Sequence, residues 1–122
     1  MTGHEFLTPD RKVRRTVFGS GDDAVQVIVN GSSTNYLCNS KLGGEVILPP
    51  FGFLAESSTF VAFHALKWNG VEYQSPVLFT LRSLDKAPVS GSRQVRVYHA
   101  FGDDQIRIGQ QTREVQREAV FP

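Results

Sequence analysis

Three histidines are the side chains in this chain that could best bind a metal or act as a catalytic base. His4, His64 and His99 are far apart in sequence, and none belongs to a pair with metal-ligand spacing. A structural zinc site normally needs clustered cysteines or histidines. The aspartates of two Gly-Asp-Asp turns, at Gly21 and Gly102, could meet and bind calcium, but such turns are usually only solvated. The sequence therefore predicts no metal site.

The single cysteine, Cys38, lies in a short strand-like run, residues 35–39. A nucleophilic cysteine needs a positioned base and a lowered pKa, and the sequence indicates neither, so we expect a buried structural thiol. There is no Gly-x-Ser-x-Gly elbow, although a Ser-His-Asp triad assembled in space stays open at this point. The glutamates carry no glycosidase signature, and no phosphate-cradling or dinucleotide glycine motif is present. We predict no catalytic residue and no cofactor.

Four aromatic side chains are candidates for carbohydrate contact, because an aromatic face complements the apolar face of a sugar ring. These candidates are Trp68, Tyr73, Tyr36 and Phe51. Trp68 precedes an Asn-Gly turn, where it could be exposed. Alternatively, Trp68 and Tyr73 cap the edge of the core, with their polar atoms reaching water, and the sequence favours this interpretation.

Charge argues against several classes of partner. Charged residues make up 20% of the chain and the net charge is +1, which does not indicate binding to nucleic acid or an anionic membrane. The basic cluster at residues 11–15 is typical of a charged strand edge, with phosphate binding as the alternative. Residues 1–7 lack the apolar region of a signal peptide, and no run is long enough to span a membrane. The sequence leaves the localisation open.

The elements that position these side chains are short runs in which apolar and polar residues alternate, separated by turn residues. Val25, Val27 and Val29 share one face of a strand, with Gln26 and Ile28 on the other. Asn-Gly and Pro-Pro pairs mark the turns, and no segment is typical of a helix. The 122 residues, 40% of them hydrophobic, suffice for one domain with its own core. We predict a linker or N-terminal arm at residues 1–12 and a single all-β domain at 13–122, an antiparallel two-sheet β-sandwich.

The strongest hairpin signal is Asn69-Gly70. It predicts that Trp68 pairs with Val71 and Lys67 with Glu72, followed by Leu66 with Tyr73 and His64 with Ser75. This register puts one set of residues on the expected core face: Phe60, Ala62, His64, Leu66, Trp68, Val71, Tyr73, Val77 and Phe79. It puts Phe63 on the opposite face. Pro76 predicts a bend or bulge in the returning strand.

Two segments carry a family resemblance: residues 25–31, VQVIVNG, and residues 45–54, EVILPPFGFL. This succession resembles the C-terminal β-sandwich domains of bacterial glycoside hydrolases, in which a strand ending in asparagine precedes a Leu-Pro-Pro-aromatic-Gly strand. FVAFHA at 60–65 and VRVYHAFGD at 95–103 look like the rest of such a domain, so the resemblance spans roughly residues 13–120. It implies an immunoglobulin-like or glycosidase C-terminal-domain-like sandwich, possessing none of the catalytic residues of the parent enzyme.

The resemblance implies a non-catalytic accessory domain of a carbohydrate-active enzyme. Such a domain packs against and stabilises a barrel-type catalytic domain of the same parent, which is then the expected partner and lies outside this chain. An apolar patch on one sheet or end is expected where that partner docks. Two alternatives remain: a carbohydrate-binding module that holds polysaccharide with exposed aromatics, and a small sandwich-fold hydrolase in which His64 or His99 meets a carboxylate and a serine.

Overall fold

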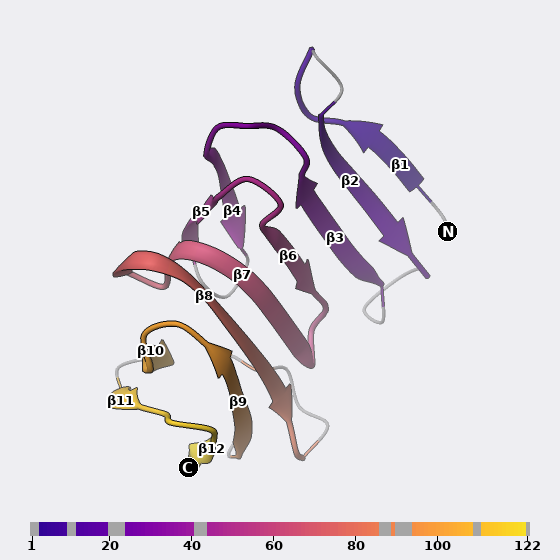
Figure 1. Ribbon diagram of the computed structural model, residues 1–122. Helices are drawn as coiled ribbons and strands as arrows, with labels where there is room; N and C mark the ends of the chain where they lie inside the picture. The colour runs from indigo at the N-terminus through magenta and orange to yellow at the C-terminus, as the bar shows by residue number, and fades with distance from the viewer. Residues whose placement is uncertain are drawn as a thin grey trace.

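The computed structural model of this protein describes residues 3–9, 12–19, 24–40, 44–85, 89, 94–108 and 111–121. These residues form twelve strands, all paired antiparallel, and no helix (Figure 1). The strands are β1 (Gly3–Phe6), β2 (Val13–Phe18), β3 (Val25–Asn30), β4 (Tyr36–Ser40), β5 (Gly44–Leu48), β6 (Phe53–Glu56), β7 (Phe60–Trp68), β8 (Val71–Ser83), β9 (Val95–Phe101), β10 (Gln105–Ile108), β11 (Gln111–Glu114) and β12 (Glu118–Phe121).

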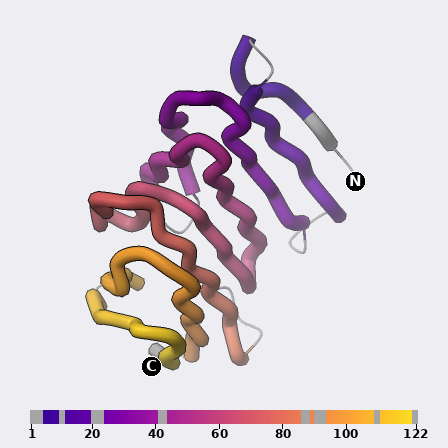
Figure 2. The backbone as a smooth tube through the Cα atoms, viewed as in Figure 1, coloured from indigo at the N-terminus to yellow at the C-terminus, as the bar shows by residue number. Residues whose placement is uncertain are grey.

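One long sheet, the main sheet, has the strand order β1-β2-β3-β6-β7-β8-β9-β12. The β4–β5 hairpin joins it only through the pairing of Ile47 with Lys67, and β10–β11 forms a separate two-stranded sheet. We call β4, β5, β10 and β11 the second layer. In Figure 2 the chain runs from β1 at one end of the main sheet to β12 at the other.

The second layer and the main sheet share one hydrophobic core. Cys38 and Leu48 from β4 and β5, and Ile106 from β10, are buried in the same cluster as Leu54 and Phe79 of the main sheet. The prediction of an all-β, antiparallel, sandwich-like fold is therefore confirmed. The segment expected to be a linker or N-terminal arm contributes β1, which pairs with β2 along its whole length.

The end of β3 is held to the corner between β5 and β6 by one buried side chain, Asn30. Its Nδ2 donates to the backbone carbonyls of Thr34, Leu48 and Pro49 at 2.8, 2.9 and 3.1 Å. Its Oδ1 accepts from the amide and the hydroxyl of Ser32. Asn30 begins the sequence Asn-Gly-Ser, which matches a glycosylation acceptor site, but a fully buried amide engaged in this way is a structural group.

The predicted register of the β7–β8 hairpin is correct at the tip and wrong further along the two strands. Asn69 and Gly70 have positive φ, Trp68 pairs with Val71, and Lys67 pairs with Glu72, as predicted. The register then shifts between Ala65 and Lys67, so that His64 pairs with Leu78 rather than Ser75. The predicted irregularity near Pro76 is thus present.

This bulge reverses the predicted faces of β7. Because side chains alternate along a strand, Phe63 and Trp68, five positions apart, would lie on opposite faces of a regular strand. With the bulge both enter the core, where their rings stack with centroids 4.7 Å apart. The prediction that Phe60, Ala62 and His64 face the core is wrong. Val61, Phe63 and Ala65 belong to the core cluster, and Ala62, although buried, does not.

We expect Asn30→Ala to lower the free energy of unfolding by about 2–4 kcal/mol, because the buried carbonyls of Leu48 and Pro49 lose their donor. Asn30→Asp keeps the volume but replaces the donor with an oxygen, and should destabilise at least as much. Urea denaturation of both variants measures this. Exposed Asn35→Ala is the control, with an expected change below about 0.5 kcal/mol; an equally small effect of Asn30→Ala would contradict the assigned role.

Candidate functional site

The four candidate carbohydrate contacts do not form a platform. Trp68 is 0% exposed and Tyr73 is buried, with its hydroxyl donating to the carbonyl of Gln105 at 2.7 Å. Tyr36 is half-buried against the core. Of the four, only Phe51 is fully available, being 77% exposed. Trp68 and Tyr73 belong to the core, but the prediction that their polar atoms reach water is wrong. The phenol binds a protein carbonyl, and the buried indole Nε1 has no hydrogen-bond partner within the described ranges.

His64 and His99 are not arranged for acid–base catalysis. Both ring nitrogens of His99 face backbone carbonyl oxygens, those of Gln116 at 3.1 Å and Phe101 at 2.9 Å, so no lone pair is directed at a substrate. His64 lies edge-on to the rings of Phe53 and Phe101. Among the residues that the structure describes, neither His64 nor His99 is hydrogen-bonded to a carboxylate or a serine. The constellation required by the hydrolase alternative is thus not formed there.

Metal ligands do not gather in the described ranges, where no three or more His, Cys, Asp or Glu side chains are grouped to hold an ion. Asp22 and Asp23, which belong to the first Gly-Asp-Asp turn, lie outside the described residues. In the second turn, the carboxylate of Asp103 accepts a hydrogen bond from the amide of Gln105 at 3.0 Å. This contact is ordinary turn chemistry.

A polar network crosses the inner side of the main sheet near Cys38. Buried Glu56 accepts hydrogen bonds from the hydroxyl of Ser40 at 2.7 Å and from the amide of Gln26 at 3.3 Å. Gln26 also accepts from Arg15, which pairs with Glu5. Burial, and then the negative charge of Glu56, raise the pKa of the Cys38 thiol from 9.0 to about 11. The expectation of a buried structural thiol agrees with this environment.

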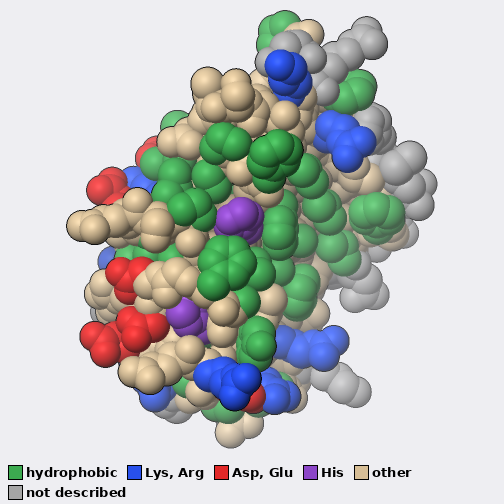
Figure 3. Space-filling view, in the orientation of Figure 1, with side chains coloured by type: hydrophobic (Ala, Val, Ile, Leu, Met, Phe, Trp, Pro, Cys, Tyr) green, Lys and Arg blue, Asp and Glu red, His purple; other side chains and the backbone are tan. Residues whose placement is uncertain are grey.

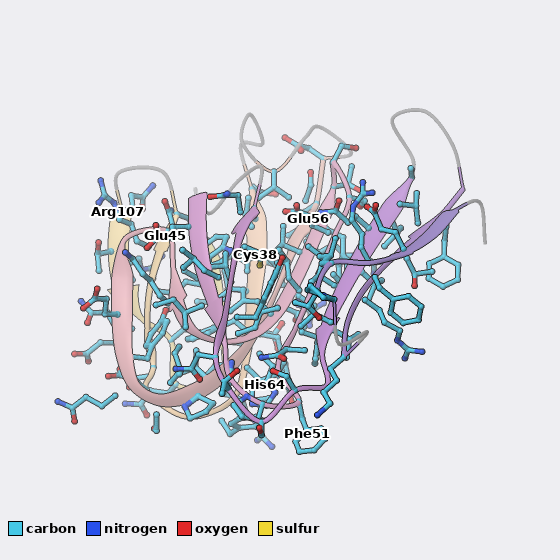
Figure 4. All side chains as sticks on the ribbon, turned by 90° about the horizontal axis from the view of Figure 1, so that it is seen from above. Cys38, Glu45, Phe51, Glu56, His64 and Arg107 are labelled. Atoms are coloured by element: carbon cyan, nitrogen blue, oxygen red, sulfur yellow. The ribbon has the colours of Figure 1, made fainter. Side chains whose placement is uncertain are left out.

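The outer side of the main sheet is the most distinctive surface of the molecule. We call it the open face, meaning the side chains of the main sheet that point away from the core. Figure 3 shows hydrophobic side chains gathered over its centre around a histidine. In Figure 4 His64 points to this side, away from Cys38 and Glu56, and Phe51 projects on the same side.

The pairing registers arrange the open face in rows that cross the strands. The aromatic row is Val29, Phe53, His64, Leu78 and Phe101. The small row, one pleat along, is Thr16, Val27, Ala55, Ala62 and Thr80. The arginine row, one pleat further, is Phe60, Arg82, Arg96 and Val120. The small row is therefore flanked on both sides by larger side chains.

Apolar exposure is concentrated on this face. Eight large hydrophobic side chains are exposed in the described part of the chain, and five of them belong to the open face: Phe6, Phe18, Tyr98, Phe101 and Val120. At the β1–β2 end the usual polarity is reversed, because Glu5 and Arg15 project on the inner side while Phe6 and Phe18 project outward. Contiguous exposed apolar surface of this kind marks an interaction site.

A depression of about 360 Å³ lies at the β7–β9 part of the open face. Its lining consists of Phe60, Thr80, Arg82, Arg96 and Tyr98. It combines two aromatic rings, two hydroxyl groups (those of Thr80 and Tyr98) and two guanidinium groups, so it suits a ligand group with an apolar part and a negative charge. Sequence reasoning missed this site, because Arg82 and Arg96 come together only through the pairing of β8 with β9.

The fold and this surface define a class: an all-β, sandwich-like protein with an uncovered apolar sheet face. Comparison with protein-family models, with curated proteins and with solved structures finds no match to this chain. In the described residues there is no helix that is long and apolar enough to cross a membrane.

The exposed Phe51 sits in a strained turn. The amide of Gly52 donates to the carbonyl of Pro49, and Phe51 has φ 64°, a value that favours glycine at this turn position. We expect Phe51→Gly to raise the free energy of unfolding by about 0.5–1 kcal/mol in urea denaturation, since the strain is relieved. Phe51→Ala removes the ring but keeps the strain, so equal stability of the two variants would contradict this explanation.

The raised pKa of Cys38 predicts slow alkylation. At pH 8 we expect iodoacetamide to modify the folded chain about 100-fold more slowly than the chain in urea, since the reactive thiolate is scarcer. Because the unfolded chain loses this proton first, the thiol contributes stability that is complete below pH 9 and is lost as the pH rises to about 11. Cys38→Ala should lack this component of the pH profile. Similar alkylation rates in both states would disprove the assignment.

Proposed function

We propose that this protein is a non-catalytic β-sandwich module that docks onto another protein domain through its open face. The observation that carries the proposal is the apolar open face, where five exposed large hydrophobic side chains and the aromatic row form one surface. A sheet normally buries one face in its own core and leaves the other polar. A module whose second face is also apolar gains stability when a partner covers it.

The size of the open face supports a stable contact. Eight strands at a spacing of ~4.8 Å and three rows of side chains give a projected area on the order of 600 Å². This approaches the roughly 800 Å² per partner that a standard protein–protein interface buries. The face is therefore large enough to hold a partner domain in one orientation.

The identity of the partner follows from the family resemblance. The strand ending at Asn30 and the Leu-Pro-Pro-Phe-Gly corner at residues 48–52 resemble glycosidase C-terminal domains. We therefore propose that the module belongs to a carbohydrate-active enzyme and packs against its barrel-type catalytic domain. In this proposal the module stabilises the enzyme, and the catalytic carboxylates belong to the partner. Trp68 and Tyr73, two of the aromatic side chains predicted to contact carbohydrate, are buried and do not support the carbohydrate-binding alternative.

Site-specific photo-crosslinking in the cells that produce the protein tests the docking. We expect p-benzoylphenylalanine at Phe101 or Phe18 to form one discrete adduct, whose peptides identify the partner domain. The same group at Leu37, an exposed position on β4, is the control and should form none. Peptides from a barrel-type catalytic domain would support the glycosidase assignment.

A charge substitution separates specific docking from incidental capture. Phe101→Asp should reduce the adduct formed at Phe18 by about tenfold or more, because a carboxylate is then buried in an apolar contact. Leu37→Asp should leave it unchanged. Equal adducts at Phe101 and Leu37, or insensitivity to Phe101→Asp, would refute docking through the open face.

A further inference from the structure

We propose that the docking partner inserts an aspartate or glutamate side chain into the depression on the open face, where Arg82 binds it. This inference rests on the proposed docking function and adds the chemistry by which the partner is recognised. The partner surface is then apolar over the aromatic row and acidic over the arginine row.

The charges of the open face are not balanced within the described strands. Arg82 and Arg96 pair directly across β8 and β9, and like charges in that position repel. Glu118 on β12 forms an ion pair with Arg96. Arg82 makes no hydrogen bond or ion pair with any residue in the described ranges, so this arginine is left to bind a ligand.

The surroundings of Arg82 suit a carboxylate attached to a short side chain. A guanidinium presents parallel N–H donors that match the two oxygens of a carboxylate. Thr80 adds a hydroxyl donor to the same depression, while the rings of Phe60 and Tyr98 flank it with apolar surface. The methylene groups of aspartate or glutamate can therefore lie against rings while the charge meets Arg82.

Docking itself makes the carboxylate necessary. In water an exposed ion pair contributes little, but a partner that covers the open face removes water from Arg82. A buried charge without a counter-ion is strongly unfavourable, so a partner lacking an acidic group at this point is rejected. Arg82 would thereby select the partner and fix its orientation.

A second copy of the chain does not satisfy these requirements. On the described strands of the open face the charged side chains are Arg14, Arg82, Arg96 and Glu118, together with Lys67 and Glu72, which form an ion pair with each other at the β7–β8 tip. Two open faces in contact would bring these arginines together, and the two carboxylates, Glu118 and Glu72, are already paired with Arg96 and Lys67. Charge complementarity therefore favours an acidic partner over self-association.

The test compares two tripeptides that differ in one group, acetyl-Phe-Asp-Leu-amide and acetyl-Phe-Asn-Leu-amide. Titrations up to millimolar concentration are followed by the backbone amide NMR shifts of Arg82 and Tyr98 in the complete chain. We expect the aspartate peptide to bind about tenfold more tightly. The difference in affinity between the two peptides should decrease at high salt concentration, because screening weakens an exposed charge pair.

Three variants assign the preference to Arg82. Arg82→Gln should reduce the aspartate preference to less than about twofold, and Arg82→Lys should retain only part of it, because lysine lacks the planar fork. Arg14→Gln removes a charge from the β2 end of the same face and should leave the preference intact. Equal binding of the two peptides, no binding of either, or a preference that survives Arg82→Gln would overturn the proposal.

Failure of this inference is distinguishable from failure of docking. If photo-crosslinking at Phe101 gives a discrete adduct while the peptides bind equally, the open face docks but does not select a carboxylate. If sedimentation shows a dimer that Phe101→Asp dissociates, the occupant is a second copy and the acidic partner is wrong. If no adduct forms at Phe101, the docking function itself is wrong.

Discussion

The structure depends on the bulge between Ala65 and Lys67. Side chains alternate strictly along a strand, so one irregularity exchanges the two faces for every residue on one side of it. Beyond the bulge, Trp68 enters the core and stacks on Phe63. Before it, Phe60, Ala62 and His64 are turned outward. On β7, the packing of Phe63 and Trp68 in the core and the outward position of His64 therefore have the same cause.

Two polar groups hold the frame on which the open face is displayed. Asn30 donates hydrogen bonds to the carbonyls of Leu48 and Pro49, which holds the corner before β6 against the end of β3. Glu56, at the other end of β6, is held by Ser40 and Gln26. Because both groups are buried and satisfied, β6 is fixed at both ends, and its outward side chains are presented in a defined register.

Much of the local structure was predictable because it depends on short-range chemistry. The Asn69-Gly70 turn follows from the tolerance of both residues for positive φ. The common face of Val25, Val27 and Val29 follows from alternation alone. Pro76 indicated an irregularity, but not how many residues of β7 it would leave unpaired. Phe60 and His64 were assigned to the wrong face because the sequence does not reveal this number.

The candidate site was less predictable because it is made by pairing between distant segments. Arg82 and Arg96 are unremarkable in sequence and become a cationic pair only when β8 lies beside β9. In the sequence Asn30 is the first residue of an Asn-Gly turn signal. Its role as a buried hydrogen-bond donor arises only because Leu48 and Pro49 lie beside it in the fold. The exposed aromatic that the sequence did identify, Phe51, is the one located in a short-range turn.

In the proposed docking, the apolar rows and the arginine row would make different contributions to recognition. Apolar contact is proportional to area and nearly indifferent to the partner, so the aromatic row alone would accept many surfaces. A guanidinium that loses water on docking penalises every partner without a matching carboxylate, and a single such group can set the register of a flat contact. The like-charged pair of Arg82 and Arg96 is destabilising in the free chain. Glu118 offsets part of this repulsion by pairing with Arg96, and in the proposed complex a partner carboxylate at Arg82 would offset the rest.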